Sequence, residues 1–280
     1  MKLQKHLIAA SISMVAFASA DSVELKTGAI HNGELIGMEA GFVRLAIMDQ
    51  QGDVEIRINP EDIANWDFED SQKLSAQPPH QSLPLLQSAY DQRYPFFEYL
   101  PIEDQKIAIM LTKLHLEKGS FSKVLDQCKH LKLISLEREI EQSLGLLEME
   151  AAWRAGDLSL ARTLATLSID AKITSDQSAL PWTLLALYDY QSEDHESARL
   201  HSLHPIAFAK QNIPPYLEHC YAIAINASTQ SGDTLHANLL KSEMNAKRLK
   251  WPTSIPRNSD LPKPAEAKPF TSDIKLKGTP

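Results

Sequence analysis

A turn followed by a small side chain recurs along the middle of this chain. The turns stand at Gly119, Gly156, Glu193 and Gly232, in steps of 37, 37 and 39 residues. Five positions after each turn comes a small or β-branched apolar residue: Val124, Ala161, Ala198 and Ala237. A fixed period of about 20 to 50 residues is typical of stacked structural repeats. The larger part of the chain is therefore predicted to consist of a repeated unit.

The unit itself is predicted to be a pair of antiparallel helices. Glycine ends a helix in left-handed geometry at low cost, and an N-cap residue then starts the next helix. Asp157, Asp194 and Asp233 stand at that cap position, with Ser120 in the first unit. Apolar residues at helical spacing support helices over 139–153 (Ile140, Leu144, Leu147, Ala151) and 158–169 (Leu160, Leu164, Leu167).

The best-defined unit has Trp182, Leu185, Ala186 in the glycine position, and Ala198 sixteen residues after the tryptophan; Tyr221 and Ala237 repeat that spacing. This pattern resembles the tetratricopeptide repeat. The resemblance covers about residues 103–250 and implies an all-α right-handed superhelix that mediates protein–protein assembly. The alternative is an irregular helical bundle in which the turns coincide by chance.

Residues 1–20 are predicted to be a signal peptide. Lys2 and Lys5 precede an apolar run, and Ala18-Ser19-Ala20 provides a small-residue cleavage site. The mature chain would then begin at Asp21 and be exported, as a periplasmic or secreted protein without an integral membrane segment. A short uncleaved anchor is the alternative.

Residues 21–70 alternate apolar and polar side chains, as half-buried strands do. Turn signals fall at Thr27-Gly28, Asn32-Gly33, Ala40-Gly41 and Gln51-Gly52-Asp53, and Pro60 opens a single helical turn. Five short strands in this length predict a small closed barrel. The spacing of Val23, Leu25, Gly28, Gly33, Leu35, Val43, Ile56 and Ile63 resembles SH3-like and Sm-like barrels. Trp66 and Phe68 either form a peptide-binding face or pack inside the molecule.

The remaining segments divide the chain further. Residues 71–82 are predicted to be a linker, 83–250 the repeat domain, and 251–280, with six prolines, a disordered tail. A first helix over Leu85–Arg93 is expected to bury Leu86, Ala89 and Tyr90. The aromatic stretch 94–97 either binds a partner or joins this helix to the first repeat.

Charge argues against a nucleic-acid ligand. The chain carries a formal net charge of −8 and has no basic stripe, whereas non-specific affinity for nucleic acid comes mainly from neutralised phosphates. If the repeats stack in order, Cys128 in the first and Cys220 in the fourth are too far apart for a disulfide. Two buried thiols are therefore expected, and a disulfide between them is the alternative.

No enzymatic motif is present. The chain lacks a nucleophile elbow, a phosphate loop, a zinc-protease motif and a dinucleotide fingerprint. His201 and His204, with His195, His219 and Cys220 nearby, are a weak metal pattern because a third fixed ligand is missing. The glutamates of 137–150 are typical of a solvated helix face. No cofactor, no metal and no catalytic residue is predicted.

These observations predict a non-enzymatic scaffold that binds a protein or peptide of the cell envelope on its helical repeats. The residues Lys113, Glu148, Tyr188 and Asn226, one from the first helix of each unit, are the predicted partner contacts. The alternatives are a wall-associated hydrolase whose solenoid shapes a substrate channel, or a structural spacer without a ligand. The sequence leaves the partner, the process and the oligomeric state open.

Overall fold

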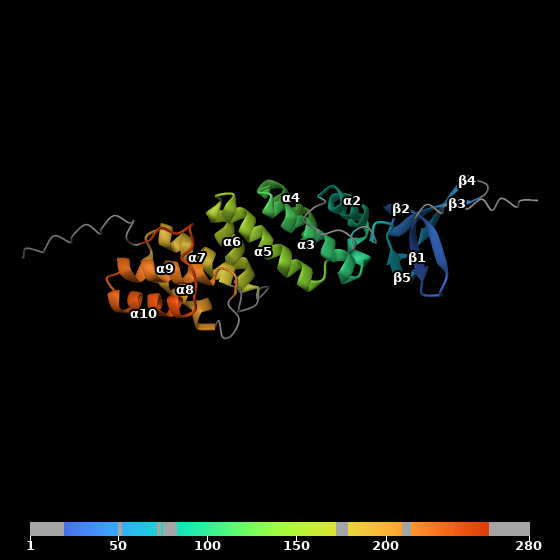
Figure 1. Cartoon of the computed structure of the whole chain (residues 1–280). Helices are drawn as coiled ribbons and strands as arrows, with labels where there is room; N and C mark the ends of the chain where they lie inside the picture. Colours follow the sequence, from blue (N-terminus) through green and yellow to red (C-terminus); the bar gives the residue numbers. More distant parts are fainter. Residues whose placement is uncertain are drawn as a thin grey trace, which may run out of the picture. The chain divides into compact units, whose positions relative to one another are not determined.

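The computed structural model describes residues 20–49, 52–71, 74, 83–171, 179–208 and 214–257 (Figure 1). It divides into two compact units. The first comprises residues up to Glu117 together with His130–Ile140, and the second comprises Lys118–Lys129 together with residues from Glu141 on. The predicted signal peptide and most of the predicted linker lie outside the described residues.

The first unit begins with a five-stranded antiparallel sheet. Its strands are β1 (Asp21–Leu25), β2 (Ile30–Glu39), β3 (Phe42–Asp49), β4 (Gly52–Ile58) and β5 (Ile63–Asp67), in the order β4-β3-β2-β1-β5. The short 3₁₀ helix η1 (Pro60–Asp62) is the predicted helical turn before the last strand. The inward side of the sheet carries the alternating residues Val23, Leu35, Val43, Leu45, Ile58 and Trp66.

One predicted turn of this sheet is wrong. Asn32-Gly33 is a turn signal in the sequence, but both residues lie inside β2, where Gly33 pairs with Asp21 of β1. The position needs glycine because β3 passes very close: an added Cβ would lie 2.1 Å from the carbonyl oxygen of Ala46. Glycine is therefore needed here because two backbones approach closely, and not because the chain turns.

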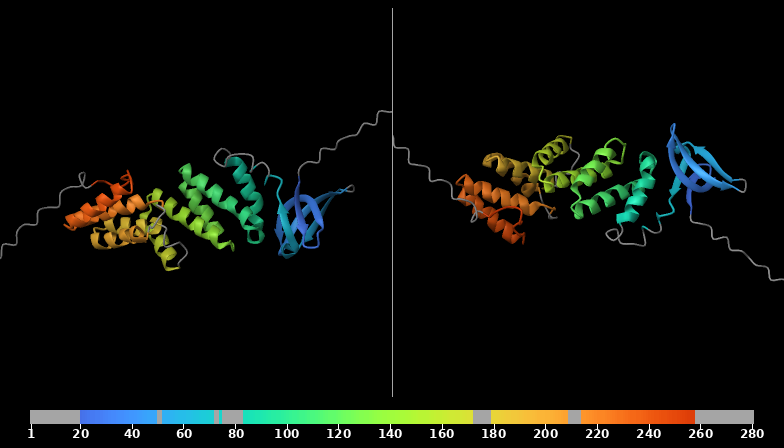
Figure 2. Two further views of the ribbon diagram at one scale, coloured as in Figure 1. Left: turned by 60° about the horizontal axis from the view of Figure 1, so that its bottom comes forward. Right: turned by 90° about the horizontal axis from the view of Figure 1, so that it is seen from above.

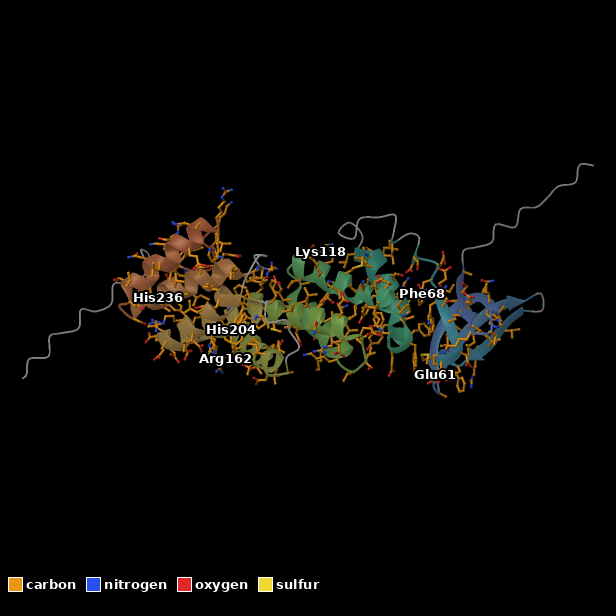
Figure 3. All side chains as sticks on the ribbon, turned by 90° about the horizontal axis from the view of Figure 1, so that it is seen from below. Glu61, Phe68, Lys118, Arg162, His204 and His236 are labelled. Atoms are coloured by element: carbon orange, nitrogen blue, oxygen red, sulfur yellow. The ribbon has the colours of Figure 1, made fainter. Side chains whose placement is uncertain are left out.

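Aromatic side chains fill the core next to the sheet. The helix α2 (Leu83–Arg93) buries Leu86, Ala89 and Tyr90 as predicted, and η3 (Tyr94–Tyr99) follows it directly. Phe96 and Phe97 of η3 are fully buried, and the ring centroid of Phe96 lies 5.4 Å from that of Trp66. The aromatic stretch therefore joins sheet and helices within this unit, as does Phe68, labelled in Figure 3.

Helices make up the rest of the described chain, nine α-helices in that part. After α2 come α3 (Ile102–Glu117), α4 (Phe121–Leu131), α5 (Arg138–Arg154), α6 (Leu158–Asp170), α7 (Ala179–Gln191), α8 (His195–Phe208), α9 (Leu217–Gln230) and α10 (Thr234–Ala246). In the second unit α7, α8, α9 and α10 pack side by side in succession, and α7 also packs directly on α9 (Figure 2). Within the described ranges, no helix is both long and apolar enough to cross a bilayer.

The predicted turns between these helices are confirmed. Gly119, Gly156, Glu193 and Gly232 all have positive φ angles. After three of them an aspartate accepts a hydrogen bond from the third residue of the next helix: Asp157 from Leu160, Asp194 from Ser197 and Asp233 from His236. The small residues Val124, Ala161, Ala198 and Ala237 are buried, as the close approach of paired helices requires.

One helix prediction needs correction. Of the apolar stripe predicted on α6, Leu164 packs partly on the core, but Leu160 and Leu167 are exposed. The buried face of α6 consists of Ala161, Ala165 and Ser168, because a close helix partner requires small residues. The helix α8 includes Pro205, whose ring is buried, and continues to Phe208.

Candidate functional site: the C-terminal turn on helices α7 and α9

The chain turns back on itself after α10. Arg248 has a left-handed backbone with a φ of 55°, and the N–H of Leu249 bonds to the carbonyl of Met244. The same bond, from an N–H to the carbonyl five residues earlier, closes the turns after α5, α7 and α9. Here arginine takes the left-handed position that glycine favours. The turn directs residues 251–257, drawn in red in Figure 1, back over α9. We call these residues the 251–257 segment.

Buried apolar side chains anchor the segment. Ile255 is only 3% exposed and belongs to the buried cluster that includes Leu187 of α7 and Ala222 and Ile223 of α9. Burying an isoleucine side chain contributes about 1.5–3 kcal/mol relative to leaving it in water. Pro252 is buried as well, and its carbonyl accepts a hydrogen bond from the N–H of Ile255 that closes a turn. Thr253, Ser254, Pro256 and Arg257 are exposed. The apolar contact of the segment therefore comes from Ile255 and Pro252, with Trp251 packed beside them.

A buried amide holds the backbone of the segment. Asn226 of α9 is fully buried and donates from Nδ2 to the carbonyl oxygen of Pro256 at 2.9 Å. Tyr190 of α7 lies beside it: burial raises the pKa of Tyr190, and the interaction with Asn226 partly offsets this increase. An amide that is buried without a partner costs about 1–3 kcal/mol, so Asn226 gains a partner when the segment is in place.

His219 contacts the segment from the start of α9. Its Nε2 and the Ser254 hydroxyl share a hydrogen bond of 3.0 Å, while its ring lies edge-on to Trp153 of α5 at 5.5 Å. Burial lowers the pKa of His219, and Glu218, with a carboxylate oxygen 3.4 Å from Nδ1, opposes that shift. The neutral imidazole is thus the form that fits this contact.

The contact residues of α9 share one helix face. His219, Ala222, Ile223 and Asn226 are spaced by three or four positions, and Leu187 and Tyr190 are spaced by three on α7. Together these six residues form what we call the segment surface. The opposite face of α9, with Leu217, Tyr221, Ala224 and Ile225, packs against α10 in a separate cluster. The helix is buried on both faces, and one of them is covered by the 251–257 segment.

The prediction of a disordered tail therefore does not hold for its first residues, 251–257. Over 251–257 the structure shows a buried anchor and two side-chain hydrogen bonds to α9 instead. Proline-rich composition indicated an unstructured stretch, but prolines are also common in turns, and Pro252 accepts the hydrogen bond from Ile255 that closes this one. The rest of the predicted tail, from residue 258, lies outside the described residues.

The predicted partner residues fall in different places. Asn226 belongs to the segment surface, and Glu148 is buried on α5. Tyr188 of α7 faces α6, where the guanidinium of Arg162, labelled in Figure 3, lies 4.5 Å from the ring centroid. Lys113 is exposed on α3, in the first unit. Ile255 and His219 were not among the contact residues predicted from the sequence, although the three- and four-residue spacing around Asn226 was visible in it.

The histidines and cysteines of the second unit have separate partners. His201 Nδ1 lies 2.6 Å from Asp189 Oδ2, whereas His204 stacks on Trp182 with centroids 3.8 Å apart. Among the described residues, no group of three or more His, Cys, Asp and Glu side chains is arranged to hold a metal ion. Cys128 and Cys220 are both buried thiols outside any disulfide, as expected. Burial raises the pKa of the Cys220 thiol, which lies 3.1 Å from the Thr183 hydroxyl, to about 12.

The first unit holds a buried charge cluster. Arg93 is 2% exposed, with NH2 2.7 Å from Asp70 Oδ1 and Nε 3.6 Å from Asp104 Oδ1. Its guanidinium also lies 4.1 Å from the ring centroid of Phe68 and donates to the Ala89 carbonyl. Burial raises the pKa of Asp104, and Arg93 opposes that shift. Each charge has a partner inside the unit, so the cluster has a structural role between sheet and helices.

Comparison of the chain with protein-family models, with curated proteins and with solved structures finds no match.

Proposed function

We propose that the protein is a non-enzymatic exported adaptor that binds a protein or peptide of the cell envelope on its α-helical part. The observation that carries the proposal is the 251–257 segment on α7 and α9, which forms a turn anchored by Ile255 and by the amide of Asn226. A surface that holds one peptide segment through a side-chain anchor and a backbone carbonyl has the chemistry to hold another.

We further propose that the five-stranded sheet closes as an SH3-like barrel and that the helices form a right-handed tetratricopeptide-like superhelix. Support for the first comes from the strand order, in which β1 lies between β2 and β5. Support for the second comes from the recurring turn with its aspartate cap. The signal-peptide pattern of residues 1–20 supports a periplasmic or secreted location.

An affinity pull-down tests the binding function. Tagged mature chain, residues 21–280, is incubated with envelope extract of the source cell, and a fragment of residues 21–77 serves as the comparison. We expect mass spectrometry to identify an envelope protein that the full chain retains and the fragment loses. A partner retained equally by the fragment would assign binding to the sheet, and recovery of nothing above background would argue for a spacer.

A further inference from the structure

The 251–257 segment occupies its surface as a ligand would, which suggests what a partner has to offer. We propose that the segment surface recognises partner segments of the same chemistry: a short turn in which a branched aliphatic residue follows an uncharged residue and precedes proline. The chain's own segment then competes with those partners. This inference rests on the proposed function and specifies the ligand and the regulation of the same site.

The apolar anchor defines the first requirement. The cluster that buries Ile255 combines Leu187 and Ile223 with the small residues Ala186, Ala198, Ala222 and Ala227, and such small residues leave room for a branched side chain. A charged side chain at this position would be desolvated without a counter-charge, because Ile255 is almost fully buried. A branched aliphatic residue is therefore required.

The backbone contact defines the second requirement. Asn226 binds the carbonyl of Pro256, which every peptide has, so this contact fixes the position of the backbone and not the side chain. Proline after the anchor has no N–H, so the peptide bond between residues 255 and 256 leaves no donor unpaired against the apolar surface. Proline also fixes its own φ angle before binding, which lowers the entropy cost.

Charge defines the third requirement. Residues 251–256 carry no charged side chain, and the basic residues Lys250 and Arg257 flank them at exposed positions. His219 meets the Ser254 hydroxyl in a neutral contact, and Glu218 is the carboxylate closest to it. An acidic side chain in place of Ser254 would add a second carboxylate to an imidazole that already has Glu218 at its other nitrogen, so the surface favours a small hydroxyl or another uncharged residue there.

The tether makes the chain's own segment a strong competitor. Only Lys247 to Lys250 separate α10 from the segment, and a short tether gives an effective concentration on the order of 1 mM. If the tethered segment and a free peptide of the same sequence both bind with a Kd of about 10 μM, the tethered segment occupies the surface about 99% of the time. The apparent affinity of the free peptide for the intact chain would be lower by about 100-fold.

A labelled peptide tests the proposal directly. The probe is a fluorescein-labelled peptide with the sequence of residues 250–257, and its binding is read by fluorescence polarisation. The proteins are the mature chain and its Ile255→Asp variant, in which the own segment is released. We expect the probe to bind the variant at least tenfold more tightly than the unchanged chain. The same peptide with aspartate in place of the isoleucine is expected not to bind.

The matched control is Thr253→Asp in the full chain. It introduces the same charge two residues away at an exposed position, so its probe affinity should equal that of the unchanged chain. Equal probe binding by the unchanged chain and Ile255→Asp, or no binding by a folded Ile255→Asp chain, would overturn the proposal. If Ile255→Asp does not fold, hydrogen exchange of the unchanged chain decides: excess unlabelled peptide should speed exchange over 249–257, and unaltered exchange would overturn the proposal.

Repeating the envelope pull-down with the Ile255→Asp chain separates this inference from the proposed function. If the probe binds but no envelope protein is recovered, the ligand chemistry stands and the adaptor function fails. If an envelope protein is recovered but the probe does not bind, the adaptor function stands and this inference fails.

Discussion

At the scale of single residues, the most constrained side chain of the first unit is Arg93. Its guanidinium contacts Asp70, Asp104 and the ring of Phe68 while almost completely buried. Neither carboxylate has another positive partner of comparable proximity in the described part of the unit. Stability here depends on keeping all three charges together, because a buried charge that loses its partner is costly.

The variant Arg93→Met measures that dependence. We expect it to lower the free energy of unfolding by about 3–5 kcal/mol, because two partly buried carboxylates remain without the guanidinium. Urea unfolding followed by Trp fluorescence provides the measurement. Arg57→Met, which removes an exposed pair with Glu39, is the control and should change stability by less than about 1 kcal/mol. A similar small loss for Arg93→Met would contradict the structural role of the cluster.

His219 makes the 251–257 segment sensitive to acid. The folded-state pKa is lowered by burial, so below the ordinary value of about 6.5 the unfolded chain takes up the proton first. The stability from the neutral ring is complete above that pH and is lost as the pH falls. We therefore expect the urea midpoint, followed by circular dichroism, to decrease between pH 7.5 and 5.5.

Substitution identifies the histidine responsible. His219→Gln should remove part of that decrease, since glutamine stays neutral and can still bond to Ser254. His130→Gln, at an exposed histidine, should leave the decrease unchanged. An identical pH profile for the His219→Gln variant and the unchanged chain would show that another group titrates.

At the scale of helices and turns, one turn departs from the others. Glu193 takes the left-handed position that glycine fills at 156 and 232, with a φ of 63°. A side chain costs about 1 kcal/mol there, because its Cβ lies close to the following carbonyl. Glu193→Gly should therefore raise the free energy of unfolding by about 0.5–1 kcal/mol, and Gly156→Ala should lower it by a similar amount. Thermal unfolding measures both, and a destabilised Glu193→Gly would indicate an unrecognised contact of the glutamate.

The turns were predictable from the sequence because their physics is local. Left-handed glycine and an aspartate cap depend on a few consecutive residues, so the spacing of Gly156 and Asp157 was enough. The strand pattern of 21–67 was predictable for the same reason, since alternation identifies a half-buried strand whichever strand it pairs with.

What the sequence did not reveal depends on partners distant along the chain. Gly33 looked like a turn residue because nothing near it indicates that Ala46 of β3 passes so closely. Leu160 and Leu167 looked like core because local hydrophobicity does not show how closely the next helix approaches. Ile255 looked like part of a polar tail because its apolar surroundings come from α7 and α9. Of the partner residues predicted from helix order, Asn226 alone belongs to the segment surface.

At the scale of the whole molecule, both cysteines belong to the second unit. Burial keeps the Cys220 pKa near 12, so a thiol reagent reaches it as thiolate only after the unit opens. We expect an aromatic disulfide reagent at pH 8 to label neither cysteine in the folded protein and both in urea. Fast labelling of the folded protein would mean that the second unit opens far more readily than its packing implies.

The indole of Trp251 donates from Nε1 to the carbonyl of Ile255 at 2.7 Å and packs on both clusters beside α9. Its emission colour depends on whether water reaches the ring, so departure of the segment should shift that emission to longer wavelength. With the other three tryptophans replaced by phenylalanine, the protein would carry an optical reporter at the site where a partner would displace the segment. Occupancy could then be followed in real time and without a dye, even in a crude extract whose binding component has not been purified.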